Sequence, residues 1–277
     1  MASPSAVRLH LPRFLLLLLA TGATAAAQTP GPPAPIQDNS FLVEEAYNQE
    51  RGVVQHINTF ARAEGGGWEY AFTQEWPFRS QRHQLSYTIP TSGADGDVGL
   101  GDVALNYRYQ AGPLDASTAF APRLTLLLPT GSSREGRGTG GVGLQVNLPF
   151  SAELPASLVA HSNAGATLTP RAHDEAGNLA AALDYTLAQS IIWLARPKLN
   201  FMLEASWTRA QEVVGPGDTQ TASELLVSPG VRGAVDLPSG LQIVPGLAFP
   251  IGVGPSSGER SVFLYLSFEH AFARRGP

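Results

Sequence analysis

The stretch Leu199-Asn200-Phe201-Met202-Leu203-Glu204-Ala205-Ser206-Trp207 decides the fold that we expect for this chain. Successive side chains of a strand point to opposite sides, so one face is Leu, Phe, Leu, Ala and Trp and the other is Asn, Met, Glu and Ser. Similar segments of about nine to eleven residues recur along the chain, the length with which a tilted strand crosses a bilayer. The pattern predicts an all-β protein, a transmembrane antiparallel up-and-down β-barrel.

About twelve strands are expected, an even number, as in single-chain bacterial barrels. They are predicted at residues 52–62, 67–78, 82–89, 99–111, 120–128, 140–150, 157–168, 179–193, 198–208, 223–235, 241–251 and 261–272.

The connectors between these strands predict the orientation of the barrel. One set is short or fairly short (80–81, 112–119, 151–156, 195–197 and 236–240), and the other is mostly longer and richer in Gly and charge (63–66, 90–98, 130–139, 169–178, 210–222 and 252–260). In outer-membrane barrels short turns face the periplasm and long loops face outside. We therefore expect a bacterial outer-membrane protein with both termini in the periplasm.

Aromatic residues gather at both ends of the predicted strands, as in the two interfacial belts of a barrel in lipid. The expected periplasmic belt is Trp76, Phe78, Tyr107, Tyr109, Phe150, Trp193, Phe201 and Phe272, and the opposite belt is Trp68, Tyr70 and Trp207. A preference of Trp and Tyr for strands in general would explain some of these positions.

The regions outside the barrel have their own patterns. Residues 1–27 are predicted to be a secretory signal peptide, with basic residues, a short apolar run and Ala25-Ala26-Ala27 at its end. Residues 28–50 form a Pro-rich leader, and Phe41 to Tyr47 are compatible with one or two helical turns serving as a short plug or periplasmic cap. The barrel is predicted over 51–273, with a tail at 274–277.

The composition fits a protein in lipid. Charged residues are 15% of the chain, against about 25% in an average soluble protein. The net charge is −5 with no basic stripe, which argues against nucleic acid as a partner. Cysteine is absent, so thiol redox chemistry and Cys-rich zinc sites are excluded.

Three prolines conflict with a regular ladder. Pro122, Pro229 and Pro245 lie in or near predicted strands, and proline has no N–H to donate to a neighbouring strand. We expect bulges or strand breaks at these positions.

Polar residues at alternate strand positions are predicted to face the lumen. The candidates for setting size and charge selectivity are Asp102, Arg108, Arg123, Asn147, His161, Asp184 and Glu204. Because unpaired buried charge is costly, these groups either contact water or pair with one another to support the wall.

The sequence offers little for catalysis. His161 and Ser162 invite comparison with outer-membrane lipases, but strand neighbours point to opposite faces and cannot share a proton without a bulge. The His residues are not clustered, and we expect no catalytic residues, no metal and no cofactor.

Several blocks of sequence resemble a known family. These are Glu44-Glu45-Ala46-Tyr47-Asn48-Gln49-Glu50 with Gly52-Val53-Val54-Gln55-His56, Gly101-Asp102-Val103 with Asn106-Tyr107-Arg108-Tyr109, Arg123-Leu124 through Leu128-Pro129-Thr130-Gly131, Gly143-Leu144-Gln145-Val146-Asn147-Leu148-Pro149, and His161-Ser162-Asn163-Ala164-Gly165. Together they resemble a family of bacterial outer-membrane barrels named for the meta-cleavage pathway of phenol degradation. The resemblance implies transport of small, including aromatic, molecules and no established catalytic residues.

We therefore expect an outer-membrane barrel for passive uptake of a small solute, with hydrophobic and aromatic molecules as candidates. Its partners would be outer-membrane lipid, the solute, and the barrel-assembly machinery, which would read the last strand ending at Phe272 although a tail follows it. The alternatives are a structural or adhesive barrel with a closed lumen, a barrel-embedded lipid hydrolase, and a soluble periplasmic β-sandwich.

Overall fold

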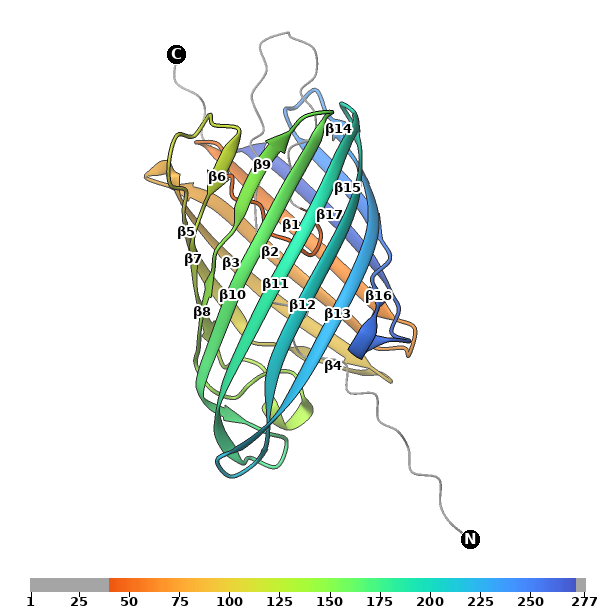
Figure 1. The fold of residues 1–277 in the computed structure, drawn as a ribbon. Coiled ribbons are helices and arrows are strands. Elements are labelled where there is room, and N and C mark those ends of the chain that lie inside the picture. Colours follow the sequence, from red (N-terminus) through yellow and green to blue (C-terminus); the bar gives the residue numbers. More distant parts are fainter. Residues whose placement is uncertain (1–39, 273–277) are drawn as a thin grey trace.

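The computed structural model describes residues 40–272 and has the expected architecture, a closed antiparallel β-barrel (Figure 1). Seventeen strand segments form one sheet, and five pairs of consecutive segments lie end to end, so the wall has twelve strands. The first and last segments pair along their whole length, from Val53 opposite Ala271 to Ala63 opposite Ser261. Closure leaves no free edge, so the backbone N–H and C=O groups are hydrogen-bonded within the wall, as they must be because lipid offers them no partners.

The segments lie on the predicted strands, but several extend beyond them, and most of the connector expected at 151–156 is strand. They are β1 (Val53–Ala63), β2 (Trp68–Phe78), β3 (Ser80–Ala94), β4 (Asp97–Leu100), β5 (Val103–Tyr109), β6 (Thr118–Phe120), β7 (Arg123–Leu128), β8 (Gly143–Asn147), β9 (Phe150–Leu154), β10 (Leu158–His173), β11 (Leu179–Arg196), β12 (Leu199–Gly215), β13 (Asp218–Gly233), β14 (Val235–Asp236), β15 (Gln242–Ala248), β16 (Ile251–Gly252) and β17 (Ser261–Ala271). Two short 3-10 turns, η2 (Ser133–Glu135) and η3 (Gly254–Ser256), are the helical elements of the described residues. No described helix is long and apolar enough to cross a membrane.

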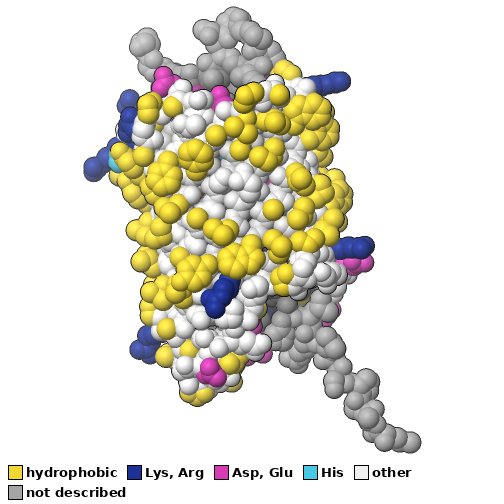
Figure 2. All heavy atoms as spheres, in the orientation of Figure 1, with side chains coloured by type: hydrophobic (Ala, Val, Ile, Leu, Met, Phe, Trp, Pro, Cys, Tyr) yellow, Lys and Arg dark blue, Asp and Glu magenta, His cyan; other side chains and the backbone are white. Residues whose placement is uncertain are grey.

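Alternation along β12 confirms the face assignment made from its sequence. Asn200 and Glu204 are fully buried inside the barrel, whereas Phe201 and Leu203 are 44% and 55% exposed on the outside. Apolar side chains spread across the outer wall in the same way (Figure 2). The wall is therefore apolar outside and polar inside, the reverse of a soluble barrel.

The two ends of the barrel differ in how far the strands extend. We call the end where β1 begins and β17 ends the terminal end, and the opposite end the distal end. At the distal end most of the loops expected at 90–98 and 210–222, and half of the one expected at 169–178, are strand, and β12 and β13 stay paired as far as Gly215 opposite Asp218. The prediction of long loops was wrong there because it relied on apolar alternation. Strands that extend beyond the hydrocarbon of the bilayer no longer need an apolar face, but their backbones remain hydrogen-bonded to each other.

The prediction of strand breaks at proline was correct at one of three positions. Pro122 separates β6 from β7. Pro229 and Pro245 lie within continuous strands, so the expected breaks there were wrong. Opposite Pro229 the neighbouring strand is interrupted instead: β15 ends at Ala248, and the Phe249 N–H donates to the Pro229 carbonyl. Because N and O of one strand residue face the same neighbour, the missing N–H of Pro229 falls at this interruption.

A further break, which the sequence analysis did not predict, separates β8 from β9 at residues 148–149. There the Leu148 N–H donates to the Ala164 carbonyl, and the Ala121 N–H donates to the Pro149 carbonyl. The backbone is therefore bonded across the interruption on both sides.

Residues 40–50, coloured red in Figure 1, enter the barrel before β1 and lie inside it. The helical turns considered for Phe41 to Tyr47 do not form, since the segment contains bends and no helical residue. The expected signal peptide at 1–27, the leader up to residue 39 and the tail after 272 lie outside the described residues.

Candidate functional site

The lumen is occupied by residues 40–50, which we call the inner segment. Nearly all of its side chains are buried. Its backbone N–H groups donate to wall side chains instead of pairing as a strand, as in Asn48 to Gln110 Oε1 (2.9 Å) and Gln49 to Gln84 Oε1 (2.7 Å). The wall therefore binds the inner segment through polar side chains and leaves the barrel ladder intact.

Glu44 is the centre of the polar contacts. One carboxylate oxygen lies 3.4 Å from Arg108 Nη1, and the other lies 3.2 Å from Arg123 Nη1 and accepts from Asn147 Nδ2 at 2.6 Å. The Asn163 side-chain amide bonds both the N–H and the carbonyl of Glu44, at 2.8 and 2.7 Å. A buried carboxylate with two guanidinium partners and an amide satisfies charges that would otherwise be costly in the lumen.

Arg108 also holds the backbone after Glu44. It donates to the carbonyls of Glu45 (2.9 Å) and Tyr47 (2.6 Å), and its Nε donates to Asn48 Oδ1 (2.7 Å). One wall side chain thus fixes four positions of the inner segment.

Glu204, on the opposite side of the lumen, holds the start of the inner segment. Its Oε1 accepts from the N–H groups of Leu42 (2.9 Å) and Val43 (3.2 Å). Ser40 Oγ donates to Ser190 Oγ at 2.6 Å. The inner segment is therefore tied to the wall at both ends and at its middle.

The structure gives His161 a partner other than Ser162. His161 is buried in the lumen with Nδ1 2.7 Å from Ser151 Oγ, which also accepts from the Ala46 N–H. Ser162 is on the outer face and donates to Gln189 Oε1. His161 and Ser162 therefore lie on opposite faces of the wall, as strand alternation predicts, and the Ser151 hydroxyl that His161 contacts also holds the inner segment.

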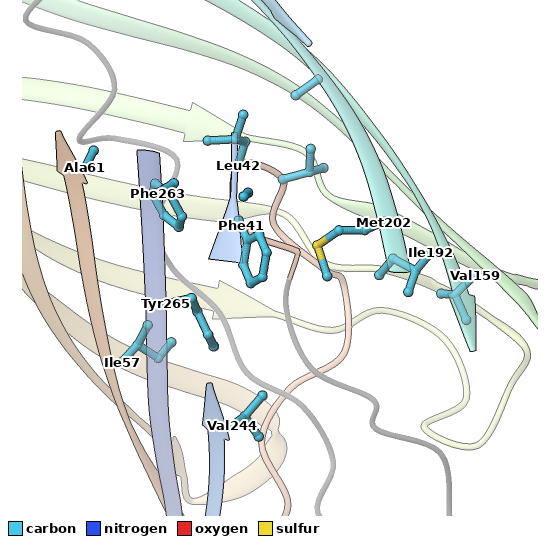
Figure 3. Close-up of a cluster of buried hydrophobic side chains, with 13 residues drawn as sticks. Phe41, Leu42, Ile57, Ala61, Val159, Ile192, Met202, Val244, Phe263 and Tyr265 are labelled. Carbon is cyan, nitrogen blue, oxygen red and sulfur yellow. The ribbon is translucent and has the colours of Figure 1, made fainter. Parts of the chain in front are cut away.

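An apolar cluster fills the part of the lumen next to these polar contacts (Figure 3). We call it the lumen cluster; it consists of Phe41, Leu42, Val43, Ile57, Ala61, Val159, Ala188, Ile192, Met202, Val244, Ala248, Phe263 and Tyr265. Three members belong to the inner segment and the others to the wall. The lumen therefore has an apolar surface beside its polar one.

Two of the predicted lumen residues, Asp102 and Asp184, bind other parts of the barrel. Asp184 is on β11 and accepts from the Gln211 N–H. Asp102 accepts from the N–H of Gly131 (3.0 Å) and from the N–H and hydroxyl of Thr139 (2.7 and 2.9 Å), so it anchors the distal loop between β7 and β8.

Side chains also hold two other distal turns, the one between β3 and β4 and the one between β10 and β11. Arg137 pairs with Asp97 and Glu135. In the turn between β10 and β11 a hydrogen bond from the Asn178 side chain lowers the pKa of Asp174 below its usual range.

Sequence reasoning found the wall residues but missed their main ligand. Arg108, Arg123, Asn147 and Glu204 were predicted from strand alternation, whereas Glu44 was assigned to a leader with a short plug or periplasmic cap and not to a contact with these residues. A signal was available: residues 44–50 carry three carboxylates and two amides in seven positions, a density that a simple leader does not need.

The closed wall, apolar outside and lined with polar groups within, defines this protein as an outer-membrane β-barrel of the porin and channel class. A family profile described as "Putative MetA-pathway of phenol degradation" matches residues 33–265, which is most of the chain, so the chain belongs to that family. The family expected from the sequence blocks is thereby confirmed. A search among curated proteins finds no match.

Solved structures share the fold. An outer-membrane channel from Pseudomonas putida F1 is 12% identical with a TM-score of 0.55, covering 81% of this chain and 97% of that one. The porin NanC is 12% identical with a TM-score of 0.53, covering 77% of this chain and 98% of that one. Both have the architecture found here.

Proposed function

We propose that this protein is a passive outer-membrane channel for a small apolar solute, with the inner segment as a plug that must shift for the solute to pass. The terminal end faces the periplasm and the distal end faces outside. Lipid covers the outer wall, and the barrel-assembly machinery recognises the last strand, which ends beside Phe272.

The observation that carries this proposal is the lumen cluster. A barrel needing only mechanical strength could fill its interior with paired charges throughout. Here one part of the lumen is apolar and includes the rings of Phe263 and Tyr265 on the wall. An apolar solute can replace the apolar side chains of the inner segment on that surface with little loss of burial.

The manner in which the inner segment is bound supports the plug. Side-chain hydrogen bonds and the Glu44 ion pairs hold it, and no strand pairs with it. These contacts can break without disturbing the twelve-strand ladder. Movement of the plug therefore requires no unfolding of the barrel.

Planar bilayer recordings of Arg108→Ala and Arg123→Ala test the plug. Either change leaves Glu44 with one guanidinium partner, and breaking a buried pair costs about 3–5 kcal/mol. We expect both variants to conduct more, or to open far more often, than the unchanged protein. Asp184→Asn is the matched control, because it alters a lumen charge that does not contact the inner segment. Equal conductance in all four proteins would contradict the proposal.

A closed structural barrel is the second candidate, favoured by the burial of the inner segment in the lumen. This candidate predicts that variants lacking the Glu44 contacts conduct ions. It also predicts that cells producing the protein take up radiolabelled toluene no faster than cells without it. Faster uptake by the producing cells would reject the closed barrel.

A further inference from the structure

The ring of Phe41 lies in a recess of the barrel wall (Figure 3). Its centroid is 5.3 Å from that of Tyr265 and 5.7 Å from that of Phe263, both on β17, and its exposed fraction is 1%. Tilted rings at these separations are in a favourable aromatic geometry. Phe41 thus has aromatic partners that come from the wall and not from its own segment.

Two glycines make room for this ring. A methyl group at Gly230 on β13 would lie 2.9 Å from Cε2 of Phe41, and one at Gly246 on β15 would overlap Cζ. Glycine weakens a strand interior, so its use there marks a close approach by another group. Because these two positions carry no side chain, they leave a recess in the wall that holds one aromatic ring.

The recess belongs to the barrel. Gly230, Gly246, Phe263 and Tyr265 come from three wall strands, and Met202 on β12 also lies within reach of the Gly230 position. The inner segment is anchored next to the recess through Glu204 and Ser190. If the inner segment withdraws, the recess therefore keeps its walls and loses only its occupant.

Polar acceptors border the recess. Among the described residues, Glu204 Oε2 and the hydroxyl of Ser228 have no hydrogen-bond partner, and both side chains are fully buried. Glu204 and Ser228 are opposite each other on β12 and β13, and Gly230 follows Ser228 on the same inward face. A ring carrying one hydroxyl or amino group could donate to them.

We propose that this recess, which we call the ring site, binds a single-ring aromatic solute, and that Phe41 occupies it as an internal substitute until the solute displaces it. The proposal rests on the proposed channel function and specifies its solute class. Fusion of a second ring would bring atoms against the wall side chains that enclose Phe41. The ring site therefore selects monocyclic molecules, with or without one donor group.

Binding of fluorobenzene to the full-length protein in detergent, followed by fluorine NMR, tests the ring site. Phe41→Ala empties it, and we expect binding to strengthen by about tenfold or more, since an apolar cavity of this kind takes up benzene-sized ligands. Gly246→Val fills it, and we expect binding to be lost. Phe41→Ala combined with Gly246→Val should also lose the binding that Phe41→Ala gained.

Conductance in planar bilayers separates this proposal from simple unplugging. Gly246→Val expels the Phe41 ring and loosens the plug, so conductance should rise while fluorobenzene binding falls. Phe41→Ala should raise both. Leu42→Ala is the matched control, because it removes a buried side chain of the inner segment outside the ring site. It should leave fluorobenzene binding unchanged, whether or not conductance rises. If Gly246→Val does not fold, as judged by the shift in gel migration on heating, Gly246→Ala replaces it in both measurements.

Two results would overturn the ring site: no fluorobenzene binding by Phe41→Ala, or binding that changes in the same direction in Phe41→Ala and Gly246→Val. Cellular uptake of toluene then separates the two proposals. Uptake that depends on the protein but is unaffected by Gly246→Val rejects the ring site and retains the channel. Uptake that never depends on the protein rejects the channel, whatever the binding data show.

Discussion

At the scale of single residues, charged side chains of the wall bind a carboxylate of the inner segment, which belongs to the same chain. Arg108 and Arg123 are almost fully buried, and Glu44 lies between them. Removing one member of such a group destabilises the fold because a buried charge loses a partner, even where the complete group adds little net stability. Glu44 is therefore the residue of the inner segment whose loss should matter most.

Glu44→Gln keeps the shape of the side chain and removes the negative charge that faces the guanidinium groups of Arg108 and Arg123. We expect the inner segment to be destabilised by about 3–5 kcal/mol against the wall, while the barrel itself stays folded. Hydrogen exchange of the amides of Leu42 and Ala46 should rise steeply, and exchange in β12 should not change. Arg134→Ala, on an exposed side chain, is the control; unchanged exchange at Leu42 in the Gln variant would show that Glu44 does not hold the segment.

At the scale of elements, strands and loops are fixed by different forces. Each strand follows an alternation of apolar and polar residues, because one of its faces meets lipid and the other meets the lumen. The distal loop between β7 and β8 has no buried apolar side chain in its 3-10 turn and depends on hydrogen bonds to Asp102. This loop should therefore be able to unfold while the barrel stays folded.

Asp102→Ala removes three hydrogen bonds to this loop, each involving a charged acceptor and worth about 1.5–3 kcal/mol. We expect residues 130–141 to become the first site of proteolysis in the folded protein, with the barrel core intact. Asp97→Asn is the comparison, because Asp97 reaches the same loop only through an exposed pair with Arg137, which contributes little. Equal proteolysis of the two variants would contradict the anchoring role of Asp102.

At the scale of the whole molecule, closure and membrane burial act together. Pairing of β1 with β17 completes the wall, and its outward side chains are then stable only in hydrocarbon. In water the same surface would be an extended apolar patch, and such patches lead to association.

Leu203→Arg and Val214→Arg test this burial on one strand. Both residues are on β12 and have similar exposed fractions, 55% and 50%, but Leu203 is the middle outward residue of the apolar run 199–207, while Val214 is next to the distal end of the strand. An arginine facing the bilayer centre costs about 2–4 kcal/mol, falling to about 0–1 kcal/mol near the interface. Unfolding in phospholipid vesicles should show this difference, and equal effects would place the distal part of β12 as deep in lipid as Leu203.

The family could be predicted from the resemblance of several sequence blocks. The strand number and the inward or outward direction of residues such as those of β12 could be predicted because the period-two pattern depends on which face meets lipid. The sequence analysis therefore placed Phe201 outside and Glu204 inside. The same local reasoning overstated the effect of Pro229 and Pro245, since their neighbours across the sheet were unknown.

The sequence by itself determined the barrel and the inward set of polar residues, because strand alternation and membrane length are properties of neighbouring residues. Only the tertiary structure decided what those residues bind. Glu44 and Arg123 are far apart in the chain, as are Phe41 and Gly246, and no periodic pattern links them. Barrel closure brings each pair together, since a ring of strands places distant segments around one lumen and leaves the inner segment to find its partners there.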